Sequence, residues 1–228
     1  MKWEDLKTYK PLDKTEIAIA KKEIENKISS DLTAFNFEKY GPKLIRRNGL
    51  LLHVIHLDSR GSWLGTSKAL KVEIAIVSIF DTDIIVNNYE PMSGTFLEDI
   101  VPGIRNYYQI TKEYDLFADF ISRNLIKFVI PYFNKFKHDN KYSSKRFCRE
   151  DHLDLFFALA NHNASNAKTV LRQKIESLRI FENTTEEIKY WEQLEKCVKN
   201  CDWEQVDIIL NSRKDAVIIK LKIKTASS

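Results

Sequence analysis

The feature that most constrains the fold is a pair of strand-like runs, residues 43–47 and 50–57, joined by Asn48-Gly49. Asn and Gly tolerate the positive φ angles of a two-residue hairpin turn. The runs on either side are short and rich in apolar residues, as strands are. The sequence therefore predicts an antiparallel hairpin at this point of the chain.

Residues 70–80 predict a third strand, in which apolar positions alternate with Lys71 and Glu73. This alternation is typical of a strand with one buried and one exposed face. The short apolar run 84–86 is a candidate fourth strand. Residues 87–111 contain Pro and Gly but little periodicity, which predicts a long connection.

Helical periodicity dominates the other parts of the chain. A helix is expected over 13–31, with Asp13 and Glu16 as a capping box. A second is expected over 113–137, where Pro131 should kink or break it. The interruption at 161–166 predicts two short helices around it.

The C-terminal part is expected to be helical as well. Thr184 and Glu187 have the spacing of a capping box, and Asp202 is placed to cap a final helix. Residues 217–223 alternate as in a strand but also fit a continued helix, which we favour. Cys197 and Cys201 would lie on the apolar face of their helix, as buried and inert thiols.

These patterns together predict an α+β fold. An antiparallel meander of three or four strands is packed by helices and followed by a helical C-terminal region. We expect residues 1–140 to form the α+β domain and residues 141–228 the helical region, packed on it as one globular unit.

Composition and motifs narrow the function classes. The net charge is +4, from 36 basic and 32 acidic residues, which is too balanced to require a nucleic-acid partner. We see no signal peptide and no membrane span, so we expect a cytoplasmic protein that does not contact membranes. Phosphate-binding loops, dinucleotide fingerprints and zinc signatures are missing, so we expect no cofactor and no metal.

The run LLHVIHLDSR, residues 51–60, holds the candidate catalytic residues His53, His56 and Asp58. Strand geometry sends alternate side chains to opposite faces, so His56 and Asp58 share one face and His53 lies on the other. The run therefore does not form a catalytic triad or a histidine metal pair by itself, and we interpret it mainly as a structural strand.

Two surfaces are candidates for binding. The first is the exposed sheet face with its loop 59–67, which carries Arg46, Arg47, Arg60 and Trp63. The second is the basic and aromatic tract 135–149. Its cations and rings suit nucleic acid or an acidic protein, and the binding candidates in it are Lys141, Tyr142, Lys145 and Arg146.

Residues 35–49, 51–60, 71–80, 125–136 and 203–224 resemble the bacterial domain of unknown function 4304 family in their order of apolar and aromatic patterns. The resemblance implies an α+β fold in a bacterial cytoplasmic protein. It also implies an immunity-like role, in which the protein binds and blocks a partner.

We therefore predict a non-enzymatic protein-binding module, immunity-like or regulatory. The alternative is a nucleic-acid-binding protein or metal-independent nuclease. In that case His53 or His56 would be the general base, and Arg46, Arg47 or Arg60 would contact phosphate.

Overall fold

A computed structural model describes residues 12–58, 69–85, 95–104, 108–135, 151–181 and 184–222. It confirms an α+β fold with an antiparallel sheet and a helical C-terminal region. The chain forms two compact units. The first contains residues 1–76 and 94–138, and the second contains residues 77–93 and 139–228.

The sheet has the strand order β1-β2-β3-β4-β5, and β6 pairs with β4. The strands are β1 (Glu38–Tyr40), β2 (Lys43–Asn48), β3 (Leu51–Asp58), β4 (Ala69–Ser78), β5 (Thr95–Phe96) and β6 (Tyr108–Gln109). Consecutive strands are neighbours from β1 to β5, so the predicted meander is confirmed.

The predicted hairpin is formed by β2 and β3, but its turn lies one residue later than expected. Asn48 pairs with Leu51, so Gly49 and Leu50 form the turn. Gly49 has a φ of 62°, and Asn48 is not among the described residues with positive φ. A positive φ at the first turn residue alone is the pattern of a type II′ turn, in which glycine is preferred.

The candidate fourth strand at 84–86 is wrong. The chain turns after β4, where the Asp81 N–H donates to the Ser78 carbonyl, and Thr82–Ile85 then form the 3₁₀ helix η2. Ile84 is fully buried there. Three apolar residues are too few to distinguish a strand from a helical turn. The predicted connection 87–111 contains β5, β6 and the short helix α2 (Leu97–Ile100) among its described residues.

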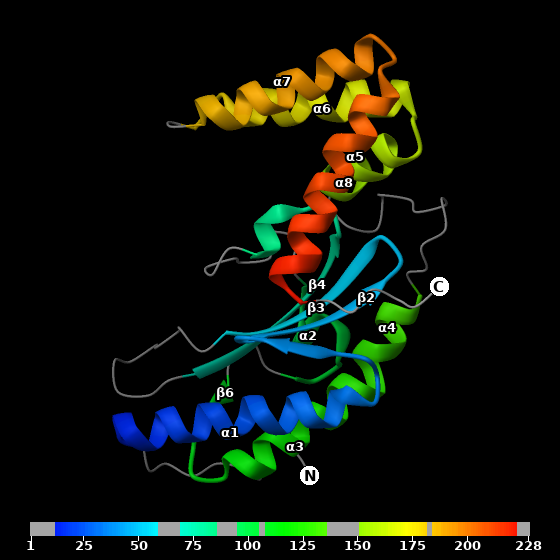
Figure 1. Ribbon diagram of the computed structural model, residues 1–228. Helices are drawn as coiled ribbons and strands as arrows, with labels where there is room; N and C mark the ends of the chain where they lie inside the picture. Colours follow the sequence, from blue (N-terminus) through cyan, green and yellow to red (C-terminus); the bar gives the residue numbers. More distant parts are fainter. Residues whose placement is uncertain are drawn as a thin grey trace. The chain divides into compact units, whose positions relative to one another are not determined.

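Helices α1 (Lys14–Thr33) and α3 (Tyr114–Asn124) lie on the same side of the sheet (Figure 1). The predicted capping box of α1 is confirmed. Asp13 Oδ1 accepts from the Glu16 N–H at 2.7 Å, and Glu16 Oε2 accepts from the Asp13 N–H at 3.0 Å. The apolar stripe of α1 is buried and consists of Ile17, Ala20, Ile24, Ile28 and Leu32.

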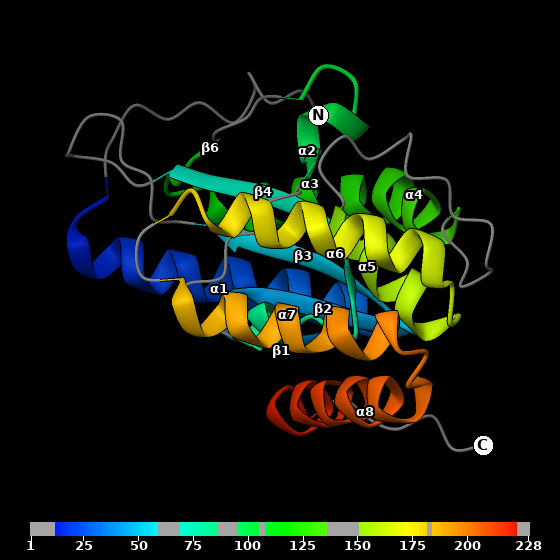
Figure 2. The ribbon, with the colours of Figure 1, turned by 90° about the horizontal axis from the view of Figure 1, so that it is seen from above.

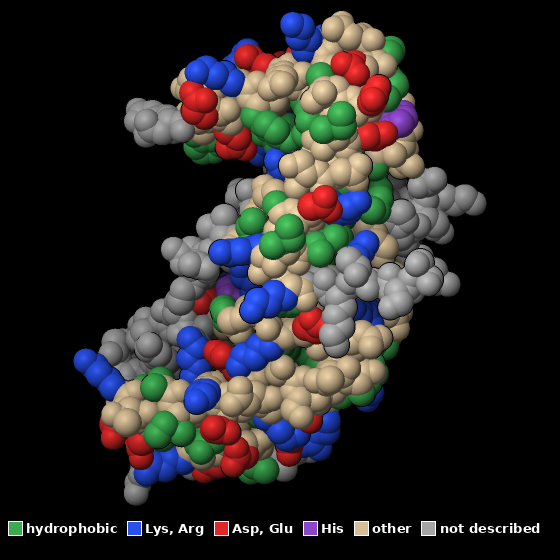
Figure 3. Space-filling view, viewed as in Figure 1, with side chains coloured by type: hydrophobic (Ala, Val, Ile, Leu, Met, Phe, Trp, Pro, Cys, Tyr) green, Lys and Arg blue, Asp and Glu red, His purple; other side chains and the backbone are tan. Residues whose placement is uncertain are grey.

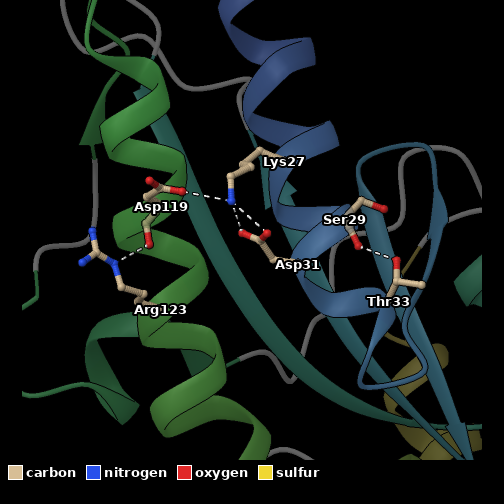
Figure 4. A network of polar contacts seen from close by, with 6 residues as sticks. All are labelled: Lys27, Ser29, Asp31, Thr33, Asp119 and Arg123. Carbon is tan, nitrogen blue, oxygen red and sulfur yellow. Dashed lines mark hydrogen bonds and ion pairs between the residues drawn. The ribbon is translucent and has the colours of Figure 1, made fainter.

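A polar link joins α1 to α3 at their surface (Figure 4). The Lys27 ammonium lies 2.7 Å from Asp31 on its own helix and 3.0 Å from Asp119 on α3. Exposed ion pairs stabilise the folded state by only about 0–1 kcal/mol, so the packing of apolar side chains is what mainly holds the two helices together. Acidic and basic side chains are mixed on the visible face in the lower part of the view, where α1 lies (Figure 3).

The predicted helix over 113–137 extends from Tyr114 to Asn134 without a break. It consists of α3, the π-helical turn η3 (Leu125–Val129) and α4 (Ile130–Asn134). The Ile130 N–H donates to the Leu125 carbonyl, five residues earlier. Pro131 has no N–H to donate, and its ring would clash with a carbonyl of a regular α-helix. The wider π turn before Pro131 relieves that clash, so the proline distorts the helix and does not end it.

The second unit is mainly helical. Its helices are α5 (Asp151–Ala160), α6 (Ala164–Leu178), α7 (Thr185–Lys199) and α8 (Trp203–Lys220). Helices α6 and α7 lie side by side (Figure 2). The predicted pair of short helices and the Asp202 cap, which accepts from the Gln205 N–H, are confirmed. Residues 217–220 belong to α8, so the helical alternative for residues 217–223 is correct as far as Lys220.

Two local predictions for α7 are wrong. Thr184 precedes the helix, but its hydroxyl donates to the Leu178 and Phe181 carbonyls and does not cap the helix. Cys201 is exposed and Cys197 is half-buried. Helix α7 ends at Lys199 and Cys201 has a φ of 57°, so the helical periodicity does not reach it.

Candidate functional site

The two histidines that the nuclease alternative would use, His53 and His56, lie in β3, and both are buried. Arg46 of β2 is opposite His53 and Lys43 is opposite His56. Alternate side chains of a strand point to opposite faces, and the two pairs are three positions apart, so Arg46 and His53 lie on one side of the sheet and Lys43 and His56 on the other.

His53 is a neutral core residue. Its ring stacks on Phe133 with 4.6 Å between centroids and 8° between planes. The Arg46 guanidinium lies 3.2 Å (Nε) and 3.0 Å (Nη2) from Nδ1, and Nη2 also donates to Asn134 Oδ1 at 2.9 Å. Nδ1 is therefore the acceptor and Nε2 carries the proton. Burial, followed by the charge of Arg46, lowers the pKa of His53 to about 3.

This environment predicts a pH dependence of stability. Below pH 6.5 the unfolded chain protonates His53, whereas the folded chain does not until about pH 3. Stability is therefore unaffected by this group above pH 6.5 and falls as the pH is lowered through the window between these values. We expect His53 to account for a loss of about 2.5 kcal/mol between pH 6.5 and about pH 4.5.

The measurement is urea unfolding of the wild type and of His53→Asn across that window. Asparagine keeps an acceptor for Arg46 but does not titrate. The free energy of unfolding should depend less on pH in the variant, and the titration of all other groups cancels in the comparison. Parallel profiles for the two proteins would contradict the assignment.

His56 takes part in a buried polar network on the other side of the sheet. Its Nδ1 lies 3.0 Å from Glu73 Oε2, and Lys71 lies 3.1 Å from Glu73 Oε1 and 3.8 Å from the Phe96 ring centroid. Burial raises the pKa of Glu73, but hydrogen bonds from His56 and Lys71 and the charge of Lys71 lower it below its ordinary value overall. Glu73 is buried, so the predicted exposed face of β4 is wrong at this position.

The first predicted binding surface is not continuous in the described residues. Arg46 and Arg47 are adjacent in β2 and therefore point to opposite faces. Arg46 is engaged with His53 and Asn134, and Arg47 donates to the Gly49 carbonyl at 3.1 Å. The remaining binding candidates lie outside the described residues, and they are Arg60, Trp63, Lys141, Tyr142, Lys145 and Arg146.

A pocket of about 210 Å³ lies in the second unit, at a place that sequence reasoning did not single out. It is lined by side chains of α5, α6, α7 and α8 and by the turn after β4. The lining residues are Asp81, Thr82, Phe156, Lys174, Glu187, Tyr190, Trp191 and Arg213.

Arg213 of α8 is the central cation of this pocket. Its Cζ lies 5.4 Å from the ring centroid of Phe156, 5.3 Å from that of Tyr190 and 5.5 Å from that of Trp191. Its Nε donates to the Phe80 carbonyl at 2.6 Å. Within the described part of the chain, no carboxylate lies at ion-pair distance from Arg213.

The other charged groups of the pocket are already engaged. Lys174 Nζ lies 3.5 Å from Glu187 Oε1, and Trp191 Nε1 donates to the same oxygen at 3.3 Å. Asp81 also makes an interaction of its own. The Tyr190 hydroxyl is buried and has no hydrogen-bond partner among the described groups. Among the described residues, the pocket therefore combines aromatic walls, an arginine with no carboxylate at ion-pair distance and a tyrosine hydroxyl without a hydrogen-bond partner.

One sequence signal pointed to this site. Val206, Leu210 and Val217 form the buried stripe of α8, and Arg213 occupies the position of that stripe between Leu210 and Val217. A cation within an apolar stripe requires a specific partner, because burying a charge is costly. The partners, however, come from α5, α7 and the turn after β4, and nothing in the local sequence of α8 identifies them.

Comparison of the chain with protein-family models, with curated proteins and with solved structures gives no match. The resemblance to the domain of unknown function 4304 family stays a prediction from the sequence. Among the described helices, none has the length and apolar character needed to cross a membrane. The described His, Cys, Asp and Glu side chains include no group of three or more that could hold a metal ion.

Proposed function

We propose that the chain is a non-enzymatic protein-binding module and that the pocket around Arg213 receives one side chain of the partner. The observation that carries this proposal is the pocket, with its aromatic walls and an arginine that has no counter-ion in the described part of the chain. Tyr, Trp and Arg are the residue types most enriched at the energetic centres of protein interfaces.

The size of the pocket supports a protein partner over a free metabolite. Sites for drug-sized ligands are usually about 300–1,000 Å³, whereas this pocket measures about 210 Å³. A volume of this size suits a single anchoring side chain. The surrounding contacts would then exclude water around the anchor, as is common at interface hot spots.

The environment of the two histidines does not support the nuclease alternative. His53 has no exposed surface, and its Nδ1 accepts from Arg46. His56 is buried beside Glu73. A general base must come within hydrogen-bond distance of the proton it removes from a substrate. An immunity-like or regulatory role, as the family resemblance implies, agrees with binding in place of catalysis.

The proposal is tested by photo-crosslinking in cells of the source organism. A benzoylphenylalanine at Thr82, which lines the pocket, is expected to give one defined protein adduct. The control is the same photoreactive residue at Ile180, which is 80% exposed on the turn after α6 and does not line the pocket.

Adduct formation at Thr82 and not at Ile180 would support the proposal. No protein adduct at Thr82, or the same adduct at both positions, would refute it. A nucleic-acid adduct at Thr82 would refute it in favour of the nucleic-acid-binding alternative.

A further inference from the structure

We infer that the group recognised by this pocket is a carboxylate, with Arg213 as its main hydrogen-bond donor. The carboxylate would belong to a protein, either as an acidic side chain or as a chain end, and this part of the inference rests on the proposed function. The chemistry of recognition, by contrast, follows from the pocket alone.

The charged groups within the pocket favour one kind of ligand group. The Glu187 carboxylate is shared by Lys174 and the Trp191 N–H, so these groups balance one another. The charge of Arg213 has no such partner among the described side chains, because its one hydrogen bond goes to a neutral carbonyl. Asp81 also lines the pocket, so its two cations and two carboxylates balance formally, but no ion pair joins Asp81 to Arg213 among the described residues. The unused donors of Arg213 therefore favour a ligand group that accepts hydrogen bonds, and a negatively charged acceptor pairs with them most strongly.

The donor geometry of Arg213 favours a carboxylate in particular. Its Nε–H is occupied by the Phe80 carbonyl, which leaves the two Nη groups as a planar pair of donors. Such a pair matches the two oxygens of a carboxylate and forms short, charge-assisted hydrogen bonds. Because three rings surround Cζ, the guanidinium is also held in position before any ligand arrives.

Other lining groups fit the rest of such a ligand. Tyr190 lines the pocket, and its hydroxyl is buried and lacks a partner among the described groups, so a ligand oxygen that came within hydrogen-bond distance would satisfy it. A buried hydroxyl without a partner is unfavourable, so a ligand that supplied an acceptor there would gain affinity. The Phe156 and Trp191 rings provide apolar surface for the methylene groups of an acidic side chain.

The experiment titrates the 228-residue chain with blocked glutamate, N-acetyl-glutamic acid N-methylamide, and follows the ¹H–¹⁵N signals of Arg213 Nε and Trp191 Nε1. Blocked glutamine is the matched neutral probe, since it has nearly the same shape without the charge. N-acetylglycine and N-acetylglycinamide form the corresponding pair for a chain end. We expect saturable shifts with one of the two carboxylates and at least about tenfold weaker binding of its neutral counterpart, because bonds to charged groups are the stronger ones.

Two variants test the roles of the donors. Arg213→Lys keeps the charge but loses the planar pair of donors, whereas Tyr190→Phe removes only the hydroxyl. Each variant should weaken carboxylate binding by at least about threefold. Lys189→Gln is the control. It removes a neighbouring cation of α7 that is paired with Glu186, and it should leave the affinity unchanged.

Equal binding of charged and neutral probes, no binding of any probe, or affinities that neither Arg213→Lys nor Tyr190→Phe changes would overturn the inference. If Arg213→Lys does not fold, the comparison of probes and the Tyr190→Phe variant still decide. A protein adduct at Thr82 without carboxylate binding would refute this inference and leave the proposed function standing. Carboxylate binding without a protein adduct at Thr82 would refute the proposed function and leave the inference of a carboxylate site standing.

Discussion

Replacing Phe133 by alanine is expected to lower the free energy of unfolding of the sheet-containing unit by about 3–5 kcal/mol. The Phe133 ring has no exposed surface. It stacks on His53, lies 6.0 Å from the Phe37 ring, and has the Arg46 guanidinium 6.0 Å from its centroid. Its removal would leave a cavity beneath a histidine whose Nε2 already lacks a partner in the described structure.

Urea unfolding followed by hydrogen exchange of the β2 and β3 amides would measure this loss. Leu116→Ala is the control, because Leu116 lies in the preceding helix α3 and is 41% exposed. That variant should change stability by no more than about 0.5 kcal/mol. A loss below about 1.5 kcal/mol for Phe133→Ala would show that the neighbouring side chains collapse into the space.

The second large effect is expected in the helical unit. Arg213→Met should lower its free energy of unfolding by about 3 kcal/mol, the sum of a charge-assisted hydrogen bond and several contacts between a cation and aromatic rings. Methionine keeps most of the volume, so the loss reports on the charge and on the Phe80 carbonyl, which no longer receives its 2.6 Å hydrogen bond.

Hydrogen exchange of the α7 and α8 amides is the appropriate measurement, since it reports on this unit alone. Lys214→Met is the matched control at the next position of α8. Lys214 donates to Asn211 on the same helix, and its replacement should cost no more than about 0.5 kcal/mol. Equal stability of Arg213→Met and Lys214→Met would contradict the prediction. It would mean that the three rings pack as well around methionine as around the guanidinium.

Most of the helices and strands could be predicted because their determinants are local. The apolar runs at 43–57 and the helical periodicity in α1 and α3 depend on residues a few positions apart. The partners of functional groups are not local. His56 pairs with Glu73, 17 residues later, and Arg46 contacts Asn134, 88 residues later. The pocket was missed for the same reason, since its lining extends from Asp81 to Arg213.

The two predicted capping boxes show where local reasoning stops. Asp13 and Thr184 each precede a helix with a glutamate three residues later, yet only Asp13 caps its helix. A carboxylate can only accept hydrogen bonds, whereas a hydroxyl can also donate. The Thr184 hydroxyl donates to two carbonyls of the turn after α6, and that turn is not visible in the capping pattern.

The hydrogen bond from Arg213 to the Phe80 carbonyl joins groups that are 133 residues apart. During synthesis the Phe80 end of this contact therefore leaves the ribosome long before its partner does. The aromatic residues of α5 and α7 also precede Arg213, so they emerge before the cation that they surround. Contacts between such distant positions form slowly, because a long loop must close first. The pocket is thus completed only after α8 has been made, and a nascent chain that ends before α8 does not contain it.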